Sequence, residues 1–457
     1  MSSPLKSVFK KEHSDEISNH SVNPVFSEVV SAFMSRRRFL QMGMVAGAAV
    51  SFPYLVKPEN AFAAKANPSA LSKAVSLGFT SIPVSTADTV TVPEGYIARP
   101  FYRWGDAVGI KGNLPEFKFD ASNTTDEQAA QAGMHHDGMA WFSLPQGKEN
   151  PAHGLLALNH EYIDNGMLFK DGTANWDLDK ARKGQNAMGI SVIEVKKDNV
   201  GWQVVRPSSF ARRITVNTPM QLSGPARHQA LMKTAADPQG EVVLGTMQNC
   251  ANGKTPWGTY LTCEENWSDI FVKKAPRNVL EKRYGISDSD ESYRWNEVDE
   301  RFSVDKTPNE PNRFGWVVEI DPYDPTSTPR KHTALGRFKH EGAAVTLAGD
   351  NRVVVYMGDD QKFEYIYKFI SENKYDPGDR KANMQLLESG TLYVARFNDD
   401  GSGDWLPLIF GENGLDQSKG FDNQGDLLIK TRLAADTVGA TKMDRPEWIA
   451  VDTHAKG

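Results

Sequence analysis

Short apolar runs separated by turn-forming clusters recur along the chain after residue 70, and this spacing limits the possible fold more than any other feature. Each run has the length of a single strand, and turn clusters such as Asn398–Gly403 separate the runs. No long helical or heptad periodicity accompanies them. The pattern therefore predicts an all-β fold. The runs lie at residues 154–161, 241–245, 315–320, 353–360, 365–369 and 391–397.

A looser repeat lies over these runs. The stretch His136–Trp141 resembles His340–Val345, and Arg445–Val451 resembles both. In the first two copies a second apolar strand follows and ends in acid, at Glu161 and at Asp359–Asp360. Repetition of strand pairs is typical of a β-propeller, in which the inner strands point toward one axis. Residues at equivalent strand ends are therefore expected to converge in space.

The N-terminal segment, residues 1–63, is expected to be an export signal. Ser35–Gln41 matches the twin-arginine pattern, and an apolar stretch and the A-x-A sequence Ala61–Ala63 follow it. Pro53 interrupts the apolar stretch, which argues against a membrane-spanning helix. We therefore expect the twin-arginine translocase to export the chain, leaving residues 64–457 as a periplasmic or extracellular domain.

Acidic residues stand at the starts or ends of the predicted strands, where a propeller would gather them at one axial mouth. Buried carboxylates repel one another, and bound cations relieve that repulsion. The formal net charge of -6 is compatible with cations and argues against a nucleic-acid partner. For any single acid, a solvated turn remains an equally simple interpretation. The set comprises Asp137, Glu161, Cys263–Glu265, Glu341, Asp359–Asp360 and Glu447.

The two cysteines of the chain, Cys250 and Cys263, leave three interpretations open. Cys263 directly precedes Glu264 and Glu265, so its thiolate would be repelled unless a cation holds all three groups. A thiolate among carboxylates suits iron or zinc, whereas oxygen ligands alone suit calcium. The alternatives are a buried, protonated thiol and, in an oxidising compartment, a Cys250–Cys263 disulfide.

Four stretches resemble motifs of the PhoX-type alkaline phosphatases, and the twin-arginine start fits that family as well. They are residues 249–267, 337–343, 356–360 and 444–448. The resemblance extends from about residue 75 to residue 457. It implies a six-bladed β-propeller that holds Fe(III) and Ca²⁺ in its central channel and hydrolyses phosphomonoesters in the periplasm. A monomer is expected.

The resemblance also implies roles for individual residues. Arg445 would contact the phosphate, which suits the forked geometry of a guanidinium group. Family members extend past the position of Gly457, so we expect the propeller to be incomplete in its last part. The implied metal ligands are Cys263, which would bind iron, Glu341, Asp360 and Glu447, to which we add Glu264 and Glu161.

Two other classes of function remain open from the sequence. A calcium-dependent propeller hydrolase of the lactonase type would bind calcium but no iron, and Cys263 would have no metal role. A secreted binding propeller without activity, including a truncated and inactive one, would hold no tightly bound iron. Cys263 beside two glutamates is the feature that separates the phosphatase from both alternatives.

Overall fold

The computed structural model describes residues 78–290 and 292–452, so the predicted export signal lies outside the described residues. Of the described residues, 101–290 and 292–452 belong to one compact unit, and residues 78–100 belong to a second, smaller unit. The described part of the smaller unit, residues 78–100, contains turns and bends without regular helix or strand. No helix in the described ranges is long and apolar enough to pass through a membrane.

Strands of the larger unit form three multi-stranded sheets and one strand pair within the described residues. The first sheet comprises β1 (His136–Ser143), β2 (His153–His160), β3 (Gly189–Lys197), β4 (Trp202–Val204) and β5 (Arg212–Ile214). The second has the order β7-β6-β11-β10-β9-β8 and comprises β6 (Pro219–Ser223), β7 (Val242–Leu244), β8 (Asn249–Lys254), β9 (Tyr260–Glu264), β10 (Val317–Ile320) and β11 (Arg330–His332). The third comprises β12 (Ala344–Leu347), β13 (Arg352–Gly358), β15 (Ile366–Lys374), β16 (Gly390–Phe397) and β17 (Gly403–Pro407), and β14 (Lys362–Glu364) pairs with β18 (Met443–Asp444).

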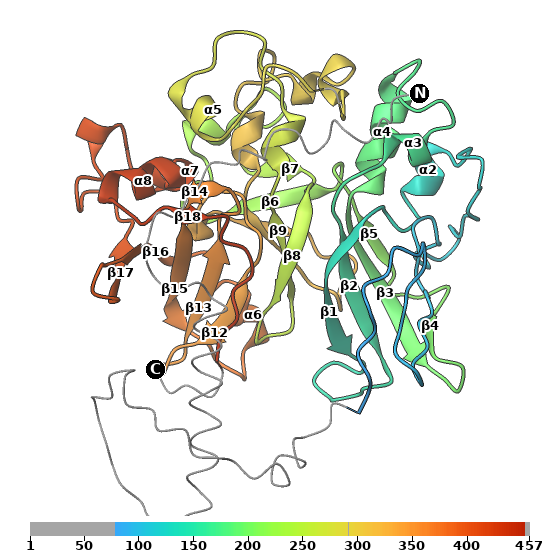
Figure 1. Cartoon of the computed structure of the whole chain (residues 1–457). Helices are drawn as coiled ribbons and strands as arrows, with labels where there is room; N and C mark the ends of the chain where they lie inside the picture. The colour runs from blue at the N-terminus through green and yellow to red at the C-terminus, as the bar shows by residue number, and fades with distance from the viewer. Residues whose placement is uncertain (1–77, 291, 453–457) are drawn as a thin grey trace, which may run out of the picture. The chain divides into compact units, whose positions relative to one another are not determined.

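Neighbouring strands are antiparallel except β6 and β11, which run parallel. Figure 1 shows the sheets side by side, from β1–β5 on the right, through β6–β9, to β12–β17 on the left. Short helices lie before β1 and in the connections between strands. They are α2 (Thr125–Gln128), α3 (Asn165–Leu168), α4 (Leu178–Ala187), α5 (Val279–Arg283), α6 (Arg380–Asn383), α7 (Gln424–Ile429) and α8 (Thr431–Val438).

The predicted strands correspond to β2, β7, β10, β13, β15 and β16, and the mostly β character of the chain is confirmed. The six blades and the closure of a propeller remain predictions. One expected strand is wrong, because residues 445–451 are irregular and the preceding strand β18 ends at Asp444. The short helices, of which α4 is the longest among the described residues, were not predicted.

The three sheets meet along one edge strand of each, β1, β8 and β12, where glycines allow close approach. A Cβ atom on Gly138 of β1 would lie 2.8 Å from the carbonyl carbon of Ala251 in β8. One on Gly253 of β8 would lie 2.2 Å from the carbonyl oxygen of Ala343, just before β12. The amide of Ala251 also donates to the carbonyl of Glu341 at 2.9 Å. Larger side chains here would force these strands apart, so the glycines set the spacing around the site described next.

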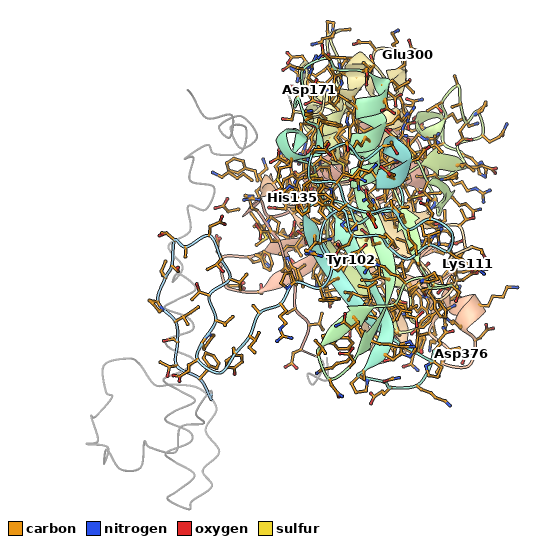
Figure 2. All side chains as sticks on the ribbon, turned by 90° about the vertical axis from the view of Figure 1, so that its right-hand side faces the viewer. Tyr102, Lys111, His135, Asp171, Glu300 and Asp376 are labelled. Atoms are coloured by element: carbon orange, nitrogen blue, oxygen red, sulfur yellow. The ribbon has the colours of Figure 1, made fainter. Side chains whose placement is uncertain are left out.

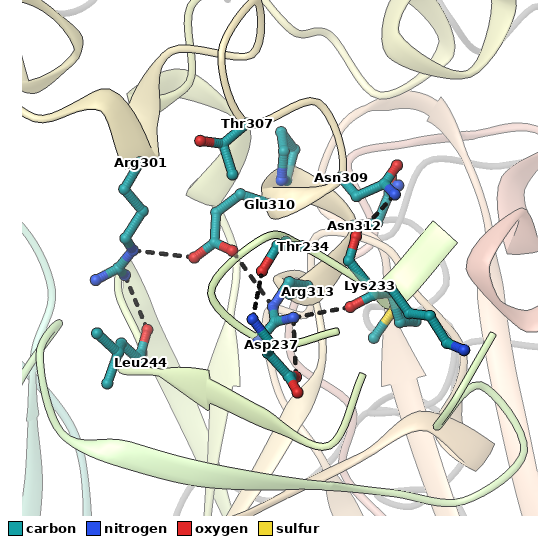
Figure 3. A network of polar contacts seen from close by, with 12 residues as sticks. Lys233, Thr234, Asp237, Leu244, Arg301, Thr307, Asn309, Glu310, Asn312 and Arg313 are labelled. Carbon is teal, nitrogen blue, oxygen red and sulfur yellow. Dashed lines mark hydrogen bonds and ion pairs between the residues drawn. The ribbon is translucent and has the colours of Figure 1, made fainter. Parts of the chain in front are cut away.

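The outer strand of the second sheet, β7, is capped by side chains. Arg301 Nη2 donates to the Leu244 carbonyl at 2.8 Å, and Arg313 Nη2 donates to the Val242 carbonyl. Glu310 accepts from Arg301 Nε at 3.0 Å and Asp237 from Arg313 Nη1 at 3.1 Å, which fixes both guanidinium groups (Figure 3). Capped carbonyls cannot pair with another strand, so this network protects the sheet edge.

Candidate metal centre

The same backbone hydrogen bond occurs in each of the three sheets and places one acidic residue per sheet at the same end. In each sheet, a residue near the end of one strand donates its amide to the carbonyl of a residue that precedes the neighbouring edge strand. The donor directly follows β2 in the first sheet and β9 in the second, and lies two residues after β13 in the third. The edge strands are β1, β8 and β12. The bonds run from Glu161 to His135 at 3.0 Å, from Glu265 to Gln248 at 2.9 Å and from Asp360 to Lys339 at 3.1 Å.

Each of these carbonyls is followed, two residues later, by a second potential metal ligand. The three residues are Asp137, Cys250 and Glu341. Each sheet therefore contributes one pair of ligand residues to the same end of the assembly. The pairs are Asp137 with Glu161, Cys250 with Glu265, and Glu341 with Asp360.

The ligand atoms of these pairs lie close together across the sheets. Cys250 Sγ lies 3.3 Å from Glu341 Oε1 and 3.7 Å from Asp137 Oδ2. Two overlapping groups, Asp137–Glu161–Cys250 and Cys250–Glu265–Glu341, each have their ligand atoms within 4.8 Å of one another. Cys250 belongs to both groups and so lies at their junction. We call Asp137, Glu161, Cys250, Glu265, Glu341 and Asp360 the carboxylate cluster.

Burial and mutual repulsion shape the electrostatics of the carboxylate cluster. Burial, followed by the charges of Asp137 and Glu341, raises the pKa of Glu161 to about 7. Burial is also the main cause that raises the pKa of Glu341 to about 7, and it raises that of Glu265 well above the usual range. Burial and the surrounding carboxylates raise the pKa of the Cys250 thiol as well. Cations would relieve these penalties and stabilise the thiolate.

The donor set fits hard and borderline cations. Carboxylate oxygens suit Ca²⁺, and a thiolate among them suits iron better than calcium. Asp360 Oδ1 is buried without a hydrogen-bond partner, which leaves a carboxylate oxygen available as a ligand. The residues present therefore fit both Fe(III) and Ca²⁺, the metals that the family resemblance implied.

Arg445 and Glu447 lie next to the cluster on the segment after β18. Arg445 Nη2 lies 2.7 Å from Asp360 Oδ2 and 3.7 Å from Glu447 Oε1. The pairing of Lys362 in β14 with Asp444 in β18 holds this segment beside Asp360. The side chain of Arg445 is 39% exposed, so its guanidinium group is accessible beside the cluster.

Two predicted ligands lie elsewhere. Glu264 is fully buried in an ion pair with Lys331 at 2.6 Å, and its other oxygen accepts the amides of Gly315 and Trp316. Successive strand residues face opposite sides, so Glu264 and Glu265 cannot both face the cluster. Cys263 lies in an apolar core with Trp257, Leu261 and Val317. We therefore replace Cys263 and Glu264 by Cys250 and Glu265 in the candidate ligand set.

Both cysteines are free thiols, so the Cys250–Cys263 disulfide interpretation is wrong for this structure. Cys250 was missed as a ligand, although a signal for it exists in the sequence. The repeat that aligns His136-Asp137-Gly138 with His340-Glu341-Gly342 also aligns Asn249-Cys250-Ala251. In this additional copy, Cys250 takes the position that Asp137 and Glu341 occupy in the other two.

A buried amide supports the position of Cys250. Asn159 Nδ2 donates to the Cys250 carbonyl and, at 3.2 Å, to the Ala251 carbonyl. Asn159 Oδ1 accepts from the hydroxyls of Tyr260 and Thr262, both at 2.8 Å. β2, β8 and β9 are thereby tied together directly behind the cluster. The β-bulge between Asn249 and Asn252 lies in the same stretch, and bulges commonly redirect a side chain near a site.

Two of three comparisons with known proteins found a match. The family described as alkaline phosphatase PhoX matches residues 77–457. The solved structure of Pseudomonas fluorescens PhoX in complex with vanadate, a transition state analogue, superposes with a TM-score of 0.79 at 48% sequence identity. That match covers 82% of this chain and 66% of the other, so the chain spans just under two thirds of that protein. A search of curated proteins found no match.

Proposed function

The chain belongs to the alkaline phosphatase PhoX family, and on that premise we propose that it hydrolyses phosphomonoesters at the carboxylate cluster. The observation that carries the proposal is the convergence of ligand residues from all three sheets, with Arg445 beside them. The structural match to Pseudomonas fluorescens PhoX, solved with vanadate as a transition state analogue, supports the same proposal of phosphomonoester hydrolysis.

Fe(III) and Ca²⁺ are the proposed metals. We propose that Asp137, Glu161, Cys250, Glu265, Glu341 and Asp360 hold them, with Glu447 at the periphery. When bound, such cations would polarise phosphoryl oxygens and would supply an activated oxygen nucleophile. Cys250 fits iron among these ligands because a thiolate is a softer donor than carboxylate oxygen.

Arg445 is the proposed phosphate-binding residue. Its guanidinium group can donate two parallel hydrogen bonds to phosphoryl oxygens. The ion pair with Asp360 orients the fork toward the cluster and leaves part of it exposed. In this position Arg445 would also neutralise charge that develops on the transferred phosphoryl group.

Export through the twin-arginine translocase, a periplasmic or extracellular location and a monomeric state remain part of the proposal. The translocase carries folded proteins, which suits a metal centre assembled from three sheets. Light scattering on the purified protein tests the monomer, and fractionation of cells tests the location.

The experiment that tests the function combines metal analysis with turnover. The purified chain should contain iron and calcium and release inorganic phosphate from 4-nitrophenyl phosphate, and chelation should abolish that release. Calcium without iron, together with hydrolysis of a lactone, would favour the lactonase-type alternative. Neither metal and no turnover would contradict the proposal and favour a binding propeller.

A further inference from the structure

A stacked ring pair lies beside the carboxylate cluster. The rings of His135 and Tyr162 have centroids 3.7 Å apart and an interplanar angle of 11°. The pair is joined to the cluster directly, because the carbonyl of His135 accepts the amide of Glu161 at 3.0 Å. Tyr162 follows Glu161 in sequence, and its partly buried side chain packs against the larger apolar core. Both residues of the stacked pair therefore adjoin Glu161, one through a backbone hydrogen bond and the other in sequence.

His135 differs from the two residues that occupy its position in the other sheets. Gln248 is buried and donates to the hydroxyl of Tyr293 at 2.6 Å. Lys339 is buried and donates to the side chain of Asn266 at 2.8 Å. Both therefore stabilise the surroundings of the site. By contrast, the side chain of His135 is exposed and stacks on the ring of Tyr162, the residue after Glu161.

The backbone of His135 is left-handed, with φ 48°. Glycine adopts this conformation most easily, and a histidine there costs conformational energy. Its neighbour His136 stacks on a different ring, that of Tyr102, with centroids 5.4 Å apart. Figure 2 labels His135 and Tyr102. The two histidines therefore serve different surfaces, and the ring of His135 is the one turned to Tyr162.

We propose that His135 and Tyr162 form a platform that binds an aromatic organic group of a phosphomonoester while its phosphoryl group occupies the carboxylate cluster. The inference rests on the proposed function and adds the substrate class. A planar ring gains most from stacking on another planar surface, whereas a small polyol does not. The platform therefore favours aryl esters over alkyl esters of phosphate, and His135 and Tyr162 determine this substrate preference.

The test uses paired ligands and paired variants of the full chain. Phenylphosphonate and methylphosphonate cannot be hydrolysed, and their dissociation constants are measured by calorimetry on metal-loaded protein. KM values for 4-nitrophenyl phosphate and glycerol 2-phosphate are measured in parallel. Tyr162→Leu removes the ring but keeps an apolar side chain, and Tyr162→Phe keeps the ring. His135→Gly removes the second ring and accepts the left-handed backbone.

We expect Tyr162→Leu and His135→Gly to weaken phenylphosphonate binding about fivefold, as the typical strength of aromatic pairs predicts. Methylphosphonate binding and metal content should stay unchanged, and Tyr162→Phe should behave as wild type. Equal losses for both phosphonates, or no loss in either ring-removing variant, would overturn the platform. Selective loss for phenylphosphonate in a protein that hydrolyses neither ester would support the platform and contradict the hydrolytic function.

Discussion

Cys250 Sγ and Glu341 Oε1 lie 3.3 Å apart although 91 residues separate them in sequence. Cys250 belongs to β8 of the second sheet, and Glu341 precedes β12 of the third. The contact therefore exists only when the two sheets are packed against each other. The candidate metal centre therefore depends on the tertiary structure, and metal content is expected to report its correct assembly.

The first prediction compares the two cysteines. Cys250→Ala should lose bound iron, because it removes the thiol shared by both ligand groups. Cys263→Ala should keep its metals and lower the free energy of unfolding by about 1–2 kcal/mol, as expected for a small cavity in a buried core. Plasma mass spectrometry gives the metal content, and urea titration gives the stability. Iron lost from the Cys263 variant and kept in the Cys250 variant would contradict this assignment.

The second prediction concerns Arg445. Arg445→Ala should raise KM for a phosphomonoester about tenfold or more, because charge-assisted hydrogen bonds contribute about 1.5–3 kcal/mol. Arg445→Lys should recover only part of the loss, since an ammonium group cannot form the forked contact. Arg396→Ala is a matched control, because Arg396 forms an exposed ion pair with Asp404 in the third sheet. Unchanged KM in Arg445→Ala with intact metal content would refute the phosphate-binding role.

Several features of this site could be predicted from the sequence because they depend on local pattern. Apolar runs ending in acid located Glu161 and Asp360 at strand ends, and the repeat placed Glu341 with them. Side-chain direction could not be predicted for the Cys263–Glu264–Glu265 stretch, because a shift of one residue reverses the face. Backbone pairing of β9 with β10, which sets Cys263 opposite Val317, fixes that register, and the ion pair of Glu264 with Lys331, 67 residues later, is consistent with it.

The segment after β18 shows another limit of sequence reasoning. The repeat predicted a strand at Glu447, and the family resemblance implied the role of Arg445, yet the segment is irregular. Arg445 has φ 55°, which a regular strand does not permit. Its position beside Asp360 depends on the two-residue strand β18 and its pairing with β14, a tertiary contact without a local pattern.

The third prediction tests the structural role of Glu264. Lys331→Met should lower the free energy of unfolding by about 3–5 kcal/mol, because it leaves a buried carboxylate without its cation. Adding Glu264→Gln to that variant should restore part of the stability, since the neutral amide can still accept the amides of Gly315 and Trp316. Urea unfolding of the two variants measures the difference. A double variant less stable than Lys331→Met would argue against a charge-balancing role for this pair.

The fourth prediction concerns the pH dependence of the metal-free protein. Glu161 and Glu341 have a pKa of about 7 in the folded state, above the ordinary value of 4.5. Between these values the folded state binds more protons than the unfolded state, so stability falls as pH rises from about 4.5 to 7. Burial and repulsion then act on both ionised carboxylates. The chelated protein should therefore melt at a progressively lower temperature across this interval.

Metal binding should reverse that trend, because cations replace the protons and affinity rises as the carboxylates ionise. Thermal melting at pH 5, 6, 7 and 8, with chelator and with added calcium and iron, measures both effects. Glu161→Gln removes one titrating carboxylate and should flatten the slope of the chelated protein. A metal-free protein whose melting temperature rises between pH 5 and 7 would show that the two carboxylates are not held together as the structure places them.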